Sequence, residues 1–237
     1  MRRHPGRAGR GPACRAGRGG QVTAPVPGAR GAEAARRLGS GLMRGLWKPR
    51  VLGAWRVPSA GPAILAVNHA HLLDGPLLLS TAPRPVHFLI KKEAFVGPLG
   101  SFLRGIGQLG IDRGSADRAA VTGCLQVLER GGVLGIFPEG TRGEGDFAAL
   151  RSGLAYFALR TGAPVVPVAV LGSADRAGRA VRALPPLRAR IDIVYGDPFL
   201  AGDGGGRRTR SALDEATTRV QRRLTGHLAR ARRTTGR

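Results

Sequence analysis

Two histidines and an aspartate stand close together in VNHAHLLDG, residues 67–75. His69 follows a run of apolar residues typical of a buried strand, and Asp74 lies five residues further on. Open α/β sheets bind ligands beyond the carboxyl ends of their strands, so His69 would project into a site. A turn that brings the Asp74 carboxylate onto the imidazole would fix one ring nitrogen as a donor and leave the other to accept a proton. Since this spacing is a weak signal, Asp74 could equally be only a helix N-cap and His69 only a polar strand end.

A second group of polar residues ends another apolar run, in GIFPEGTRG, residues 135–143. Gly140 lets the backbone approach a ligand closely, Thr141 offers a hydroxyl, and the planar guanidinium of Arg142 suits a phosphate. An ordinary turn with a solvated ion pair could have the same composition, so both interpretations stay open at this point.

Further cations lie between these two stretches. Lys91 or Lys92 and then Arg113 fall in loop positions that follow predicted strands. A base-like histidine surrounded by cations at strand ends suits attack by a hydroxyl on a substrate that carries a phosphate.

The elements that would position these residues follow from the hydrophobic pattern. Apolar runs predict strands, the last of them half-buried because its residues alternate; helical spacing predicts helices between them. Strands separated by helices indicate an α/β fold, a single domain with a largely parallel sheet flanked by helices. The expected strands are 63–68, 86–90, 133–137, 164–170 and 189–196, and the expected helices are 76–82, 115–132, 147–162 and 209–235.

The chain has 237 residues, which suits one such domain with tails. We expect residues 1–42 to be a disordered Gly/Arg-rich tail, 43–203 to form the main domain, and 204–237 to be a basic C-terminal helix or tail. Met43 stands where organised sequence begins, so it is a candidate for the true start. The two cysteines, Cys14 and Cys124, do not make a disulfide framework, and Cys124 falls in a helical, buried pattern.

The formal net charge of +23 indicates an anionic partner or surface. A nucleic-acid-binding protein is one candidate class, but the few aromatic residues offer no stacking platform for bases. No apolar run reaches the ~18–20 residues that cross a bilayer, so we expect a soluble or peripheral protein. Residues 41–55, GLMRGLWKPRVLGAW, mix apolar and basic side chains as an interfacial helix does, or form an ordinary helix packed on the sheet.

Four blocks in this order resemble the glycerolipid acyltransferase family, whose best-known members are the 1-acyl-glycerol-3-phosphate acyltransferases. The resemblance covers roughly residues 45–200. The blocks are NHxxxxD (Asn68, His69, Asp74), KExF…IDR (Lys92 to Arg113), FPEGTR (137–142) and VPV (166–168).

The resemblance implies transfer of an acyl chain from acyl-CoA or an acyl-carrier protein to the hydroxyl of 1-acyl-glycerol-3-phosphate. It implies no cofactor, no metal and no covalent acyl-enzyme. His69 would be the general base and Asp74 would orient it. The positions that correspond to the family's binding site for the phosphate-bearing acceptor are Lys92, Arg113, Glu139, Gly140, Thr141 and Arg142. Because a carboxylate repels phosphate, Glu139 would rather anchor the loop or position an arginine.

The chain departs from the family pattern at two positions. His71 stands where the family usually has Ser, and Gly143 follows FPEGTR where a Ser is common. His71 could change the acceptor preference, so another lysolipid, such as a lyso-amino-acid lipid, is an alternative acceptor. A catalytically dead lipid-binding homologue is disfavoured because His69 and Asp74 are both present. The expected partners are the acyl donor, the lysophospholipid and an anionic membrane surface, without specific nucleic acid, and the expected location is cytoplasmic, on the inner face of the cell membrane.

Overall fold

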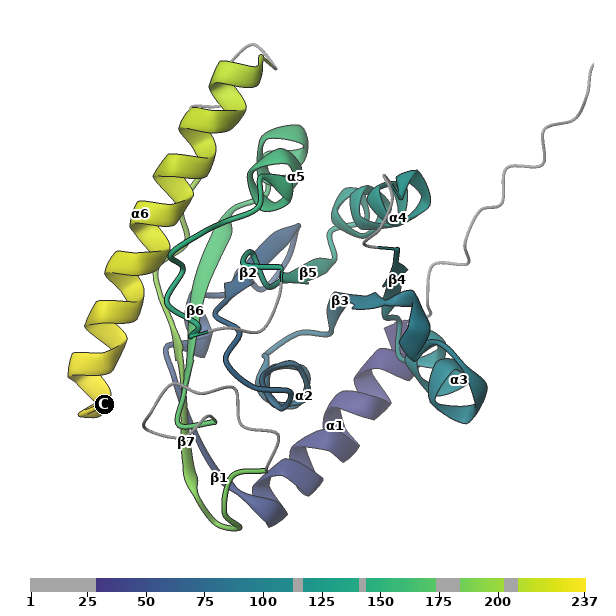
Figure 1. Cartoon of the computed structure of the whole chain (residues 1–237). Helices are drawn as coiled ribbons and strands as arrows, with labels where there is room; N and C mark the ends of the chain where they lie inside the picture. Colours follow the sequence, from purple (N-terminus) through teal and green to yellow (C-terminus); the bar gives the residue numbers. More distant parts are fainter. Residues whose placement is uncertain (1–28, 113–116, 141–143, 174–183, 203–208) are drawn as a thin grey trace, which may run out of the picture.

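The computed structural model describes residues 29–112, 117–140, 144–173, 184–202 and 209–237. These residues form helices on both sides of a seven-stranded sheet, in the order β1-β7-β6-β2-β5-β3-β4 (Figure 1). The strands are β1 (Lys48–Leu52), β2 (Ala63–Val67), β3 (Val86–Lys91), β4 (Leu109–Ile111), β5 (Val133–Ile136), β6 (Val165–Leu171) and β7 (Arg190–Tyr195). The helices are α1 (Ala29–Leu46), α2 (Asp74–Thr81), α3 (Gly97–Gly105), α4 (Arg118–Glu129), α5 (Gly153–Thr161) and α6 (Arg210–Thr235), with short 3-10 turns η1 (Ala54–Arg56) and η2 (Lys92–Ala94).

The sheet is largely parallel, which confirms the predicted fold class. Strands β2, β3, β4, β5 and β6 run in one direction, so their carboxyl ends meet at one edge, which we call the carboxyl edge. Strand β7 pairs antiparallel with β6, and β1 pairs parallel with β7, so β1 and β7 run the opposite way. The end of β1 therefore points to the edge opposite the carboxyl edge.

Two apolar layers hold the sheet between the helices. On one face, Met43 of α1, Leu77 of α2 and Trp47, which follows α1, belong to a cluster that also includes β2 and β7 residues. On the other face, α4, α5 and α6 contribute Leu128, Leu154 and Leu224. The predicted helix at 209–235 is confirmed as α6, and its buried residues recur every three or four positions, so that they face the sheet. Cys124 is buried in α4, as its pattern predicts.

The predicted tail at 1–42 was wrong for its last part. Residues 29–42 belong to helix α1, whereas residues 1–28 lie outside the described residues. Glu33 forms ion pairs with Arg36 and Arg37 at helical spacing, and α1 packs against α2, where Gly39 comes close to Ser80. Composition alone suggested disorder because it does not register this packing.

The stretch 41–55 is not one amphipathic helix. Helix α1 ends at Leu46, and the chain continues as strand β1 and turn η1. Met43 and Trp47 are buried in the core, and the Trp47 indole donates a hydrogen bond to the Pro185 carbonyl. Trp55 is left exposed on η1. The interpretation of an element packed on the sheet is therefore right for the first part of this stretch.

Two further expectations need correction. Strand β7 is buried along almost its whole length, not half-buried, because α6 covers one of its faces and the α1 layer the other. Helix α5 begins at Gly153 and not at 147. Phe147 adopts a left-handed backbone conformation with φ 62°, which a continuous helix does not allow.

Candidate active site

The His69 and Asp74 side chains meet at the carboxyl edge of the sheet. His69 lies two residues beyond β2, and its Nδ1 is 3.4 Å from Oδ2 of Asp74. The same oxygen accepts hydrogen bonds from the backbone amides of Ala70 at 2.9 Å and His71 at 2.7 Å. Asp74 is fully buried at the start of α2, whereas the His69 side chain is 15% exposed. The carboxylate thus shapes the turn and faces the imidazole at the same time.

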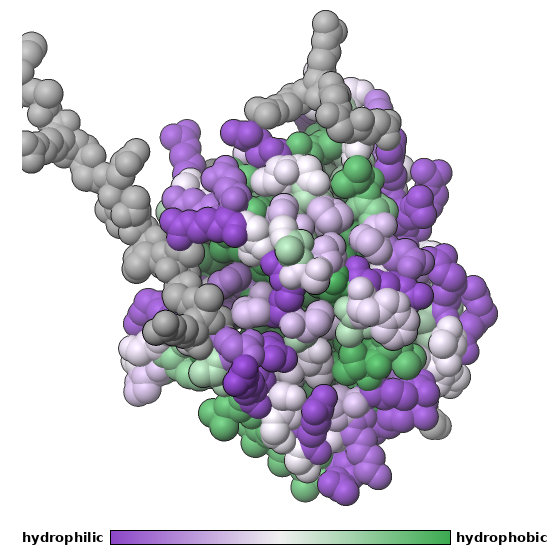
Figure 2. Space-filling model, turned by 180° about the vertical axis from the view of Figure 1, so that it is seen from behind, coloured by the Kyte–Doolittle hydropathy of each residue, from purple (hydrophilic) through white to green (hydrophobic). Residues whose placement is uncertain are grey.

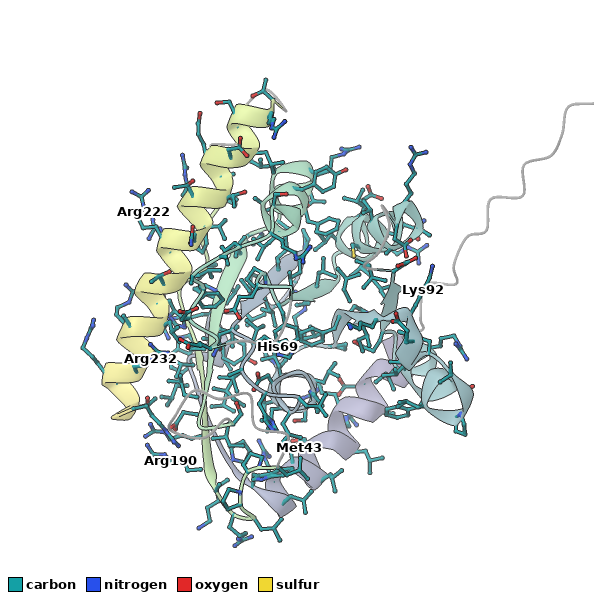
Figure 3. All side chains as sticks on the ribbon, viewed as in Figure 1. Met43, His69, Lys92, Arg190, Arg222 and Arg232 are labelled. Carbon is teal, nitrogen blue, oxygen red and sulfur yellow. The ribbon has the colours of Figure 1, made fainter. Side chains whose placement is uncertain are left out.

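Two neighbours, Asn68 and Phe137, hold the His69 imidazole in place. Asn68 is buried, and its side chain donates to the carbonyl of Val170 and accepts from the amide of the same residue, at 3.0 and 2.7 Å. The Asn68 side chain thus continues the hydrogen bonding between β2 and β6 beyond the end of β2, and it fixes the position of the residue before His69. The Phe137 ring stacks on the imidazole with 4.0 Å between ring centroids. Figure 3 shows His69 near the middle of the molecule, between the helix layers.

His71 has a different environment from His69. It is buried, and its Nδ1 accepts a hydrogen bond from the amide of Leu73 at 3.2 Å. That bond lies within the turn between the two candidate catalytic residues, so His71 contributes to the shape of the turn.

Glu139 joins the FPEG loop to the catalytic turn. Its Oε1 accepts a hydrogen bond from the Phe147 amide at 3.1 Å, and the backbone amide of His69 is a second donor to the carboxylate. Burial raises the pKa of Glu139 to about 7; these two amides oppose the shift, and the nearby Asp146 and Asp74 carboxylates add to it. The prediction that this residue anchors the loop agrees with these contacts.

The C-terminal helix supports the same loop from its other side. Gln221 on α6 donates to the carbonyls of Phe147 and Ala148 at 3.1 and 2.7 Å. These bonds hold Phe147 in its left-handed conformation, in which its amide reaches Glu139. A chain of contacts therefore runs from α6 through the loop to the backbone of His69. Nothing in the sequence around Gln221 signals this role.

Gly140 makes the sharp turn of the FPEG loop. Its φ is 76°, and a Cβ atom at this position would collide with the side chain of Arg151. The Arg151 amide donates to the Pro138 carbonyl at 2.8 Å, so the arginine lies directly over the loop. Sequence analysis did not select Arg151. The only sequence signal for a role of Arg151 is its place shortly before a helix start, and this signal is weak because the chain has many arginines.

The remaining predicted binding residues are placed only in part. Lys92 is 60% exposed and pairs with Asp117, with 3.4 Å between Nζ and Oδ2, and Figure 3 shows it well away from His69, on the α3 and α4 side of the molecule. The pKa of Asp117 is lowered, first by the Asp112 amide and then by the Ala120 amide, with a smaller contribution from Lys92. Arg113, Thr141 and Arg142 lie outside the described residues.

An apolar pocket of about 300 Å³ opens beside this site. It lies between α4 and α5 above the ends of β3, β4 and β5, and Phe137, which stacks on His69, is part of its wall. Gly140 and Arg151 also line the pocket, and Asp112 is the other charged residue in its wall. The other lining residues include Leu89, Ile111, Val121, Leu154, Tyr156 and Phe157.

The part of the chain that the structure describes contains no group of three or more His, Cys, Asp or Glu side chains that could hold a metal ion. Among the described helices, none combines the length and apolar character that a membrane span requires.

Comparison with known proteins agrees with this geometry. The 1-acyl-sn-glycerol-3-phosphate acyltransferase of Bacillus subtilis is 25% identical over 177 residues, which cover 74% of this chain and 85% of that protein. The chloroplastic acyltransferase LPAT1 of Arabidopsis thaliana, with the same activity in its name, is 30% identical over 54% of this chain and 37% of its own length. The crystal structure of the 1-acyl-sn-glycerophosphate acyltransferase PlsC from Thermotoga maritima has the same fold, with a TM-score of 0.62 and 22% identity, and the match covers 84% of this chain and 79% of that one.

The family model described as Acyltransferase matches residues 48–171. This segment contains strands β1 to β6, the His69–Asp74 turn and the FPEG loop. Since the match covers more than half of the 237 residues, the chain belongs to the acyltransferase family.

Proposed function

We propose that this acyltransferase moves a fatty acyl chain from a thioester donor to the free hydroxyl of 1-acyl-glycerol-3-phosphate, which yields phosphatidic acid. The names of the Bacillus, Arabidopsis and Thermotoga proteins support this acceptor. The donor is acyl-CoA or an acyl-carrier protein.

The observation that carries the proposal is the partly exposed imidazole with a buried carboxylate at its Nδ1. With Nδ1 turned to Asp74, Nε2 of His69 is the nitrogen that takes a proton. Stacking on Phe137 limits rotation of the ring, so Nε2 keeps one direction. A group held in this way is suited to deprotonate an alcohol as it attacks.

The reaction balances without a further reactant. Nε2 of His69 removes the hydroxyl proton while the oxygen attacks the thioester carbonyl, which forms the new C–O bond. The tetrahedral intermediate collapses with cleavage of the C–S bond, and the imidazolium returns the proton to the departing thiolate. Asp74 stabilises the imidazolium throughout, at the distance of 3.4 Å given above. A thioester is already activated, so positioning and deprotonation suffice.

The apolar pocket suits the acyl chain, because it lies directly beside the base. Phe137 belongs to the wall of the pocket and also stacks on the His69 imidazole. The volume and apolar walls of the pocket resemble those of small-molecule sites in general. Arg151 also lines this pocket, and its guanidinium suits a phosphate or the donor's polar part. The family resemblance adds Lys92, Arg113, Thr141 and Arg142 as residues for the acceptor's phosphate, although Lys92 does not line the pocket.

We assign the protein to the inner face of the cell membrane, where its lipid acceptor resides. The net charge of +23 supports attachment to anionic lipid, because each Lys or Arg near such a surface contributes about 1 kcal/mol.

The test is acyl transfer to lysophosphatidic acid compared with a panel of other lysolipids, with thiol release from acyl-CoA as the readout. We expect lysophosphatidic acid to be the best acceptor and His69→Ala to abolish turnover. The assignment of the acceptor would be refuted if the protein acylated another lysolipid but turned over lysophosphatidic acid no faster than the blank without enzyme.

A further inference from the structure

Helix α3 has an exposed apolar side without a partner in the described part of the chain. Val96, at its N-cap, is 68% exposed, and Leu99 and Phe102 are each 55% exposed. The three residues recur every third position, so they line one side of the helix. Burying such side chains releases free energy, so this face needs an occupant.

The position of α3 relates it to the active site. Strands β2 and β3 both run parallel to β5, so their carboxyl ends lie at the same edge of the sheet. His69 follows β2 and α3 follows β3, and both therefore lie at the carboxyl edge. Leu72, in the turn between His69 and Asp74, is also exposed at this edge.

Charge around this apolar side indicates what covers it. The segment that contains these apolar residues, 91–105, is basic, since the exposed Lys91, Lys92 and Arg104 outnumber the exposed Glu93. Figure 2 shows that hydrophobic groups, in green, lie between purple charged ones on the surface of the molecule. Apolar side chains bordered by cations complement the interface of an anionic bilayer.

We propose that α3 is the element by which the protein docks on an anionic bilayer, with Val96, Leu99 and Phe102 inserted at the level of the lipid headgroups. Docking in this orientation turns the carboxyl edge, and with it His69, toward the membrane, so that a lysolipid reaches the base without leaving the interface completely. The inference rests on the proposed function in so far as the acceptor is a membrane lipid.

This assignment replaces the stretch 41–55 as the membrane contact. Met43 and Trp47 of that stretch are in the core, and Leu42, on α1, is its exposed apolar residue before Trp55. Trp55 is 80% exposed, but it follows β1, which runs opposite to β2 and β3, and so it lies at the other edge of the sheet. An orientation that buries Trp55 in lipid would point the active site away from the membrane.

The experiment uses the full chain and vesicles of phosphatidylcholine mixed with phosphatidylglycerol. The double variant Leu99→Ser/Phe102→Ser removes the apolar side of α3, and Trp55→Ser is the matched control at the opposite edge. Sedimentation is measured at low salt and at about 1 M salt, where the Debye length is about 3 Å and charge attraction is screened. We expect about a tenfold lower partition coefficient at high salt for the double variant, and no change for Trp55→Ser.

Turnover supplies an independent readout. With a short-chain lysolipid that is dissolved as a monomer, all three proteins should work equally, which also shows that the double variant is folded. With the acceptor embedded in vesicles, we expect the double variant alone to lose about tenfold in rate. Absence of turnover of the dissolved acceptor by the wild type would contradict the proposed function, and leaves the vesicle experiment to decide the docking surface by itself.

A fluorescent variant tests insertion directly. Phe102→Trp in a Trp55→Phe background should shift its emission to shorter wavelengths when vesicles are added. The proposal is overturned by an unshifted emission, by wild-type binding that vanishes at high salt, or by loss of binding in Trp55→Ser instead of the double variant.

Discussion

Replacing Asp74 by Asn tests the role of the carboxylate charge. An asparagine oxygen in the place of Oδ2 can still accept the amides of Ala70 and His71, so the turn keeps its shape, but the charge next to His69 is lost. Two unit charges at 3.4 Å interact by about 5 kcal/mol at an effective dielectric constant of about 20. Because the His69 side chain is 15% exposed, we take about 3 to 4 kcal/mol as the loss of stabilisation of the imidazolium in the transition state.

This loss corresponds to a rate that is about 10² to 10³ times lower. The assay is steady-state acyl transfer to lysophosphatidic acid, with kcat and KM measured separately and a thermal melt to check folding. We expect kcat to fall and KM to change little, because the imidazole gains its charge only as it takes the hydroxyl proton in the transition state. His69→Ala/Asp74→Asn should be no slower than His69→Ala alone, since the carboxylate acts through the base. A folded Asp74→Asn variant that keeps more than about a third of the wild-type kcat would refute this reasoning.

Three further predictions concern the surroundings of the base. His71→Ser should keep most of the activity, because a Ser hydroxyl can accept the Leu73 amide in the same way as the imidazole does, whereas comparable loss in His71→Ser and His69→Ala in the acyl-transfer assay would contradict the division of roles. The pKa of Glu139 is raised to about 7 in the folded chain, so the contribution of this group to folding stability is fully present below pH 4.5 and is lost as the pH rises through about 7. After a discount for partial exposure, the contribution amounts to about 1 to 2 kcal/mol. In urea unfolding at several pH values, the free energy of unfolding of Glu139→Gln should therefore depend less on pH than that of the wild type. Gln221→Ala should lower the free energy of unfolding by about 1 to 3 kcal/mol and reduce kcat several-fold, with Gln221→Glu more severe because a carboxylate would face two carbonyls, and unchanged kinetics in both would show that α6 does not position the loop.

The central strands and the catalytic pair could be predicted from the sequence because their signals are local. Strands β2, β5 and β6 are short apolar runs, buried on both faces, and the turn from His69 to Asp74 closes over five residues. A residue pair of this kind depends on one turn and is recognisable without the rest of the fold.

The elements that were missed depend on contacts with distant parts of the chain. Strand β1 is an outermost strand of the sheet and contains Pro49. Strand β4 has only three residues, with Gly110 in the middle, and α3 contains several glycines, which weaken a helix. Each is stabilised by its neighbours in the sheet and not by its own propensity. Gln221 belongs to the same class, since its contact with Phe147 spans 74 residues and no motif surrounds it.

The central place of β2 in the sheet has a consequence for the time at which the enzyme becomes active. The residue before the catalytic base is held by Val170, 102 positions later in the chain. At a synthesis rate of about 5 to 20 residues per second, about 5 to 20 seconds pass on the ribosome between the translation of His69 and that of its support. The nascent chain therefore holds its base unpositioned until both neighbours of β2, strands β5 and β6, have emerged. Catalytic competence therefore comes only after β6, the last strand of the parallel part of the sheet, has been made.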